Sequence, residues 1–396
     1  MGRVKQQLIE FETMNLGSIP EKNLCIKHVE DKAIQSFIRK NYENGYCDYC
    51  GKNLKVVSLE DLMFFIMEGI SFFYEDAANF MPYNSREGGY LGQTYTKEEL
   101  ICDLVELKTE PFELTEDIID SITDSVVWAE PNAHYNSPSD ELIYRWNYFK
   151  DVVKHKSRYL FYDYDSTDIY DDYSGRDISI ILKEVGKIIT QLGLIQSIEA
   201  KEVLLRCRQH KTGEKISELT EIVSPPTKFA IYPNRFSPSG IPMLYAAFDK
   251  ETAFSETVDY SNKKSNQMSF GEFKLNKKIN VIDFSKLPPI PSIFDVKKKK
   301  KYFLISFLHD LIKDMTKGIS RDGKEHIEYV PTQIVTEYFR YVFNKNRKAK
   351  IDGLIYPSSK NNPKKAIVIF WDNEECLENL ELINIEDVTI TNPDKE

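Results

Sequence analysis

The sequence predicts an α+β protein with a mainly α-helical N-terminal half and a mixed C-terminal half. In the first half, apolar residues recur at the three- and four-residue spacing typical of helices packed on a core. From about residue 200, short segments rich in β-branched and aromatic residues alternate with turns. The charge changes at the same place, from −15 over residues 1–200 to +5 over residues 201–396. These observations predict two domains, 1–200 and 201–396.

Helical periodicity dominates the first predicted domain. Ser58 is placed to cap a helix, because Asp61 follows it by three residues and an apolar run begins there. We predict helices over residues 29–40, from Ser58 to about Ala78, and over 97–107, 115–128, 139–157 and 178–198.

The second predicted domain mixes strands and helices. Asp249 is a plausible N-cap for a short helix that follows one of the strands. Strands are predicted over 228–231, 243–248, 270–273, 279–284, 353–356 and 366–371, and further helices over 302–315 and 331–345.

Composition narrows the class of protein. The chain has 396 residues, 41% hydrophobic and 29% charged, which is typical of globular proteins and not of disordered ones. No apolar run approaches the ~20 residues that span a bilayer, and the N-terminus lacks the apolar segment of a signal peptide. We therefore expect a cytoplasmic protein with six reduced cysteines.

The charge distribution bears on partners. The acidic half is poorly suited to bind nucleic acid phosphates, whereas the basic half suits an anionic ligand. Five of the basic charges form one run at residues 297–301, which we interpret as a solvated loop.

Four potential metal ligands lie close together near the N-terminus. Cys25 and His28 are separated by two residues, and so are Cys47 and Cys50, with 18 residues between the pairs. Two-residue spacers let both side chains of a pair reach one metal, and three thiolates with one imidazole form a closed tetrahedral zinc set. Gly51 suits the tight turn of a zinc knuckle. The sequence predicts a structural zinc site, and two unrelated pairs of buried thiols are the alternative.

A second group of polar residues flanks a predicted strand. Arg235 stands in a turn with two prolines and Gly240, Tyr245 lies on the strand, and Glu256 lies on the helix after it. These side chains converge if strand and helix flank one cleft. The spacing is equally consistent with a surface arginine, a core tyrosine and a solvated glutamate.

The blocks around these residues resemble the RES domain, a family named for Arg, Glu and Ser. The resemblance spans about residues 200–372, and its motifs occur in the family's order. They are Arg235, Leu244-Tyr245, the Thr-Ala-x-x-Glu helix at 252–256, the helix entry at 329–333, and the strand end at 352–358 with Ser358.

The N-terminal half resembles the HEPN-like region that often precedes RES domains. The similar segments are 25–51, 87–90 and 149–161. His28 departs from the family pattern, which has a cysteine there, but imidazole also binds zinc. HEPN ribonucleases carry an arginine followed four to six residues later by histidine, and this half has no such pair. We therefore interpret it as a non-catalytic regulatory or recognition module.

The resemblance implies an ADP-ribosyltransferase-like fold and NAD-degrading toxin activity. It implies that Arg235 binds the diphosphate, Tyr245 stacks on a base, and Glu256 holds a ribose hydroxyl and stabilises positive charge. Ser358 donates to phosphate or to the nicotinamide amide. Additional phosphate contacts from Arg206 and Arg208, and Ser359 as an alternative to Ser358, complete the expected set.

Several alternatives remain open at this stage. Water as acceptor makes the protein an NAD glycohydrolase, inorganic phosphate makes it a phosphorylase, and a protein or nucleic acid makes it an ADP-ribosyltransferase. A zinc-bearing sensor without catalysis is a further alternative. No dinucleotide-binding G-x-G-x-x-G follows a strand, which disfavours hydride transfer. The resemblance implies a toxin or antiphage effector restrained by an antitoxin or regulatory partner. A homo-oligomer stays open, and membrane and nucleic acid partners are not expected.

Overall fold

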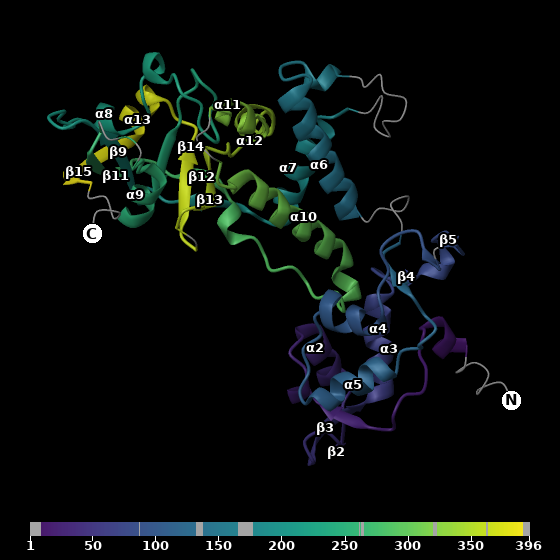
Figure 1. Ribbon diagram of the computed structural model, residues 1–396. Helices are drawn as coiled ribbons and strands as arrows, with labels where there is room; N and C mark the ends of the chain where they lie inside the picture. The colour runs from purple at the N-terminus through teal and green to yellow at the C-terminus, as the bar shows by residue number, and fades with distance from the viewer. Residues whose placement is uncertain are drawn as a thin grey trace. The chain divides into compact units, whose positions relative to one another are not determined.

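The computed structural model describes residues 9–86, 88–131, 138–164, 177–260, 262, 265–319, 323–361 and 363–390. Glu87, in one of the segments that carry the HEPN-like resemblance, lies outside them. The chain forms two compact units (Figure 1). The first comprises Met1–Ser139 and Pro289–Leu304, and the second comprises Asp140–Pro288 and Ile305–Glu396. The predicted domains, 1–200 and 201–396, are defined along the sequence, and their boundary stays a prediction.

The first unit packs helices against a small antiparallel sheet. Its core centres on the helix that Ser58 caps, where Leu62 and Ile66 are fully buried. The predicted cap is confirmed, since Ser58 Oγ accepts the Asp61 N–H at 3.0 Å. The sheet has the order β1-β3-β2. Its strands are β1 (Asn23–Cys25), β2 (Glu43–Cys47) and β3 (Lys52–Ser58), and the helices are α2 (Lys32–Asn41), α3 (Leu59–Ile70) and α5 (Phe112–Asp120).

Three predicted helices of this unit are shorter than expected. The one predicted over 115–128 is α5, which ends at Asp120. Helix α3 ends at Ile70 instead of about Ala78, because the next residues turn back through bonds to the Ile70 carbonyl. The chain is thereby placed to pair β4 (Glu75–Asp76) with β7 (Trp128–Ala129). The segment predicted at 97–107 is one turn of α-helix, α4 (Lys97–Glu99), followed by a π-helical turn at Leu100–Leu104.

A segment distant in sequence completes the first unit beside α3. The backbone of Ile293 and Phe294 approaches Gly69 so closely that an added Cβ would lie 2.9 Å from the Phe294 Cα.

We expect Gly69→Ala to destabilise this unit by about 1–3 kcal/mol, because the backbone must shift to admit the methyl group. Urea unfolding of the full chain measures this effect. Glu68→Ala, on the exposed neighbouring position, serves as control; equal unfolding curves for both variants would contradict the close approach.

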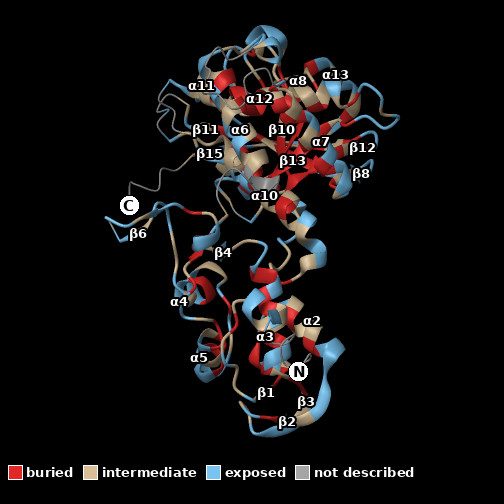
Figure 2. Ribbon diagram, turned by 90° about the vertical axis from the view of Figure 1, so that its right-hand side faces the viewer, coloured by how far each residue is buried: buried red, intermediate tan, exposed pale blue. Residues whose placement is uncertain are grey.

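An eight-stranded sheet forms the centre of the second unit (Figure 1). Its order is β15-β11-β9-β10-β14-β13-β12-β8, antiparallel except for the pair β12 and β13. Buried residues line β12 and β13 in Figure 2. The strands are β8 (Ile195–Ile198), β9 (Val203–His210), β10 (Leu244–Ala247), β11 (Gln267–Leu275), β12 (Ile279–Asp283), β13 (Gly353–Pro357), β14 (Lys365–Ile369) and β15 (Leu380–Thr389).

The helices of the second unit include α6 (Pro138–His155), α7 (Ile180–Gln191), α9 (Lys250–Thr257), α12 (Val330–Glu337) and α13 (Asn373–Asn379). Helix α10 (Lys299–Thr316) continues from the first unit into the second. The lysine run at 297–301 is therefore helical, not the predicted loop, although most of its side chains are exposed. None of the helices in the described parts of the chain combines the length and apolar character needed to cross a bilayer.

Five of the six predicted strands are confirmed, as β10, β11, β12, β13 and β14. The strand predicted at 228–231 is wrong: the chain forms a 3-10 helix at Thr227–Phe229, because two prolines precede it and the Phe229 N–H bonds the Pro226 carbonyl. The helix predicted over 178–198 ends at Gln191 and is followed by β8.

Candidate functional site

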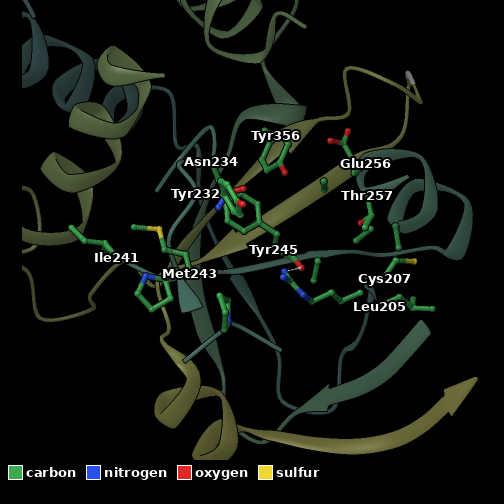
Figure 3. Close-up of a pocket in the computed structure, with 18 of the residues that line it drawn as sticks. Leu205, Cys207, Tyr232, Asn234, Ile241, Met243, Tyr245, Glu256, Thr257 and Tyr356 are labelled. Atoms are coloured by element: carbon green, nitrogen blue, oxygen red, sulfur yellow. Dashed lines mark hydrogen bonds between the residues drawn. The ribbon is translucent and has the colours of Figure 1, made fainter. Parts of the chain in front are cut away.

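A cavity of about 360 Å³ lies between β9 and β10 in the second unit (Figure 3). These strands are joined by one residue pair, Ala247 with Leu205, so the sheet opens beside it. Residues from β9, β10, β13, α9 and the loop before β10 line the cavity. Its volume lies within the ~300–1,000 Å³ typical of small-molecule sites.

Glu256 supplies a carboxylate to this cavity from the last turn of α9. Its Oε1 accepts a hydrogen bond from the Ser358 hydroxyl at 2.5 Å. Ser358 is 2% exposed, and its oxygen accepts N–H groups from Lys360 and Asn361 at 3.3 and 3.0 Å. Because these two donors occupy the oxygen, the hydroxyl hydrogen points to Glu256. The turn after β13 thus fixes the orientation of the carboxylate.

Arg206 supplies a cation to the same cavity from β9. Its Nη1 donates to the Tyr245 carbonyl at 2.7 Å, and its buried Nε has no hydrogen-bond partner in the described chain. No carboxylate of the described residues forms an ion pair with it. Burial lowers the pKa of Arg206, although a guanidinium stays charged at neutral pH. Arg206 therefore places a positive charge at the wall of the cavity, which suits an anionic ligand.

Two tyrosines also line the cavity. The Tyr245 hydroxyl accepts the Phe236 N–H at 3.1 Å and lies 3.0 Å from Ser237 Oγ, while burial raises its pKa to about 12. Tyr356 was not among the predicted site residues. Burial and the nearby Glu256 carboxylate raise its pKa well above 10, so it is a neutral hydroxyl at pH 7. Tyr356 lies on β13 and Ser358 follows the last residue of that strand, so its position two residues before Ser358 was the available signal.

The other predicted residues lie elsewhere. Arg235 donates to the carbonyls of Met315 and Lys317 at 2.8 and 2.7 Å, and it lines a second cavity of about 370 Å³ beside α10. Arg208 pairs with Glu214 and is exposed, and Ser359 is exposed on the turn after β13. The structure thus brings together Arg206, Tyr245, Glu256 and Ser358 at one cavity, whereas Arg235, Arg208 and Ser359 do not line it. The Arg235 guanidinium still interacts electrostatically with Tyr245 and Tyr356. The catalytic and binding roles of all seven stay predictions.

The helix that carries Glu256 begins at a charged cap. Asp249 accepts the Thr252 N–H at 2.9 Å and the Thr252 hydroxyl at 2.8 Å, and it pairs with Lys364. Burial acts to raise the pKa of Asp249, but the bonds from Thr252 and the Lys364 ammonium outweigh it and hold that pKa below its usual 3.8.

We expect Asp249→Ala to lower the free energy of unfolding of the second unit by about 1 kcal/mol at pH 7. Because folding lowers the pKa of Asp249, its charge stabilises the fold fully above pH 3.8 and loses this effect as the pH falls through the folded-state pKa. The difference between wild type and variant should therefore shrink in acid. Urea unfolding at several pH values measures it, and a difference that grows in acid would contradict the assignment.

The first unit contains the second candidate site. The ligand atoms of Cys25, His28, Cys47 and Cys50 all lie within 4.8 Å of one another. Cys25 and Cys47 end β1 and β2, and Cys50 stands in the turn before β3. Gly51 completes that turn with a φ of +67°, a conformation that glycine adopts without strain. The predicted convergence of the two pairs is confirmed.

The hydrogen bond of His28 fits a metal ligand. Its Nδ1 lies 2.5 Å from the Glu110 carbonyl, which can only accept, so Nδ1 is the donor and Nε2 is the ring nitrogen left to bind a metal. Nε2 is buried and has no partner in the described chain. A buried nitrogen without a hydrogen-bond partner lowers the stability of the fold. In zinc-bound histidines, the ring nitrogen that does not bind the metal typically donates to a backbone carbonyl or carboxylate. The residues therefore fit zinc, and an ion held by all four of them would have no open position for a substrate.

Comparison with protein families identifies the class of each region. Residues 204–391, which include all residues that line the cavity, match the RES domain. The preceding region matches HEPN/RES N-terminal domain 1 over residues 40–167, which includes Cys47 and Cys50. The chain thus carries a HEPN/RES N-terminal domain followed by a RES domain, and the resemblance inferred from the motifs is confirmed. No curated protein matches the chain.

Proposed function

We propose that this protein consumes NAD by cleaving its nicotinamide–ribose bond in the cavity between β9 and β10. The RES domain indicates an NAD-related, toxin-like function. The main support is one cavity that is lined by Arg206, which forms no ion pair with a carboxylate of the described residues, and by Glu256, whose carboxylate the buried Ser358 orients.

The reaction needs the groups that line the cavity. Nicotinamide leaves as a neutral molecule while positive charge develops on the ribose, and the Glu256 carboxylate stabilises that charge. Ser358 acts as a positioning residue, because it holds the carboxylate in one orientation. Arg206 lines the cavity and supplies the positive charge that binds the diphosphate. The ring of Tyr245 offers a flat face to the nicotinamide.

The acceptor decides the product. Water adds its oxygen to the ribose C1 and releases a proton, which makes the protein a glycohydrolase that yields ADP-ribose. Inorganic phosphate in the same position makes it a phosphorylase. A protein or nucleic acid acceptor makes it an ADP-ribosyltransferase. We favour loss of free NAD, since the cavity is of the size that small-molecule sites have.

Depletion of NAD arrests growth, so we assign the protein to the toxins or antiphage effectors of the cytoplasm. Such an enzyme needs an antitoxin or regulatory partner. The zinc-bearing N-terminal domain is a regulatory or recognition module in this proposal, with zinc as its structural ion and NAD as the substrate of the RES domain.

The test follows NAD in time with the purified full-length protein, with and without inorganic phosphate. We expect loss of NAD with release of one nicotinamide per NAD. Mass spectrometry of the second product distinguishes ADP-ribose from its phosphorylated form and from a modified protein. Release of no nicotinamide under any of these conditions would contradict NAD cleavage.

A further inference from the structure

We propose that Phe229 and Tyr232 form an aromatic rim that binds the adenine ring of NAD and makes the site select dinucleotides over mononucleotides. This inference rests on the proposed function and extends it to substrate specificity. It concerns two side chains that the sequence analysis did not assign.

The side chains of the rim are largely exposed to solvent. Phe229 is 63% exposed, Ile231 63% and Tyr232 76%, so three large apolar side chains within four residues face solvent. Phe229 and Tyr232 line the cavity that holds Arg206 and Glu256 (Figure 3). Exposed apolar clusters beside a cavity are typical of binding surfaces.

The backbone beneath the rim is held in place. The Ala230 carbonyl accepts the Gly240 N–H at 2.6 Å, and the Asn234 N–H donates to the Ser237 carbonyl at 2.8 Å. The buried Gln333 side chain donates to the Asn234 carbonyl at 2.8 Å. The two rings therefore stand on a loop that is ordered before any ligand binds, which lowers the entropic cost of binding.

The residues of the cavity range from buried to exposed. Tyr356 is 7% exposed, Arg206 and Glu256 are half-buried, and the rim is exposed. With the reacting ribose at Glu256 and the diphosphate at Arg206, the adenosine end reaches toward the exposed rim. Adenine presents a flat face that stacks on aromatic side chains, and such stacking tolerates partial exposure.

The experiment uses Glu256→Gln as the background, so that NAD binds without turnover. Calorimetric titrations with NAD and with nicotinamide mononucleotide, which lacks the adenylate, compare this protein with versions that add Tyr232→Ala, Phe229→Ala or Ile231→Ala. We expect the Kd for NAD to rise about tenfold with Tyr232→Ala or Phe229→Ala, equivalent to about 1.4 kcal/mol. The Kd for the mononucleotide should stay unchanged, and Ile231→Ala should change neither.

The outcomes separate the two proposals. If Tyr232→Ala and Phe229→Ala leave NAD binding unchanged, or weaken both ligands equally, the adenine assignment is wrong. If the background protein does not bind NAD, both the rim and the proposed function are wrong. If NAD binding depends on the rim while the wild-type protein releases no nicotinamide, only the proposed reaction is wrong. Thermal melts confirm that these surface variants remain folded.

Discussion

Glu256→Gln is expected to lower the rate of NAD cleavage by about 10²–10³-fold or more, with the KM for NAD changed little. The amide keeps the shape of the side chain and removes the negative charge that stabilises the developing positive charge on the ribose. The Ser358 hydroxyl can still donate to the amide oxygen, so the local fold is retained. Release of nicotinamide at saturating NAD measures the effect.

Glu251→Gln is the matched control for this variant. Glu251 lies on the same helix, and its carboxylate pairs with Lys364 without lining the cavity. We expect its kcat to remain within about twofold of wild type, as is usual for an exposed ion pair that is worth little. Equal rates for Glu256→Gln and Glu251→Gln would refute the catalytic assignment of Glu256.

Loss of the metal is expected to unfold the first unit. Structural zinc sites contribute binding free energies of about 10–16 kcal/mol, as much as the whole stability of a typical domain. Removing zinc leaves a buried, unpaired nitrogen on His28 and three thiols close together. We expect Cys47→Ser, or a strong chelator, to release one zinc per chain and to remove the helical signal of this unit. Metal analysis and circular dichroism measure both changes.

Cys102→Ser provides the control for the zinc experiment. Cys102 belongs to the same unit but is exposed and lies outside the four-residue cluster. We expect this variant to keep its zinc and its melting temperature. A wild-type protein purified without chelator that contains no zinc would show that the cluster is a set of reduced thiols.

Local sequence patterns predicted much of the secondary structure. Amphipathic spacing identified α2, α5, α6 and α7, and the Ser58 and Asp249 caps are present as predicted. The sequence patterns did not predict those elements whose presence or length depends on tertiary contacts. β15 is the edge strand of the sheet and pairs along β11, and most of its residues are exposed or half-buried, so it lacks the strict alternation of a half-buried strand. The predicted length of α3 failed because pairing of β4 with β7 redirects the chain.

The candidate sites differ in how far the sequence predicts them. The four metal ligands come in two close pairs, and spacing alone indicated their convergence. Glu256 and Ser358 lie 102 residues apart, and only their motifs pointed to a shared site. The directions of the arginine side chains were not predictable. Arg235 donates a hydrogen bond to a backbone carbonyl at the C-terminal end of α10. Arg206 instead donates to the Tyr245 carbonyl beside the cavity.

The sequence by itself determined the α+β class, the family and the metal ligands, because these depend on local periodicity and on residue types at short or characteristic spacing. The tertiary structure alone decided which arginine faces the cavity, that Tyr356 lines it, and that an exposed aromatic rim borders it. These features depend on how β9, β10 and β13 come together from distant parts of the chain. Side-chain direction and burial follow from that pairing and from the hydrogen-bond partners it provides, which no local pattern contains.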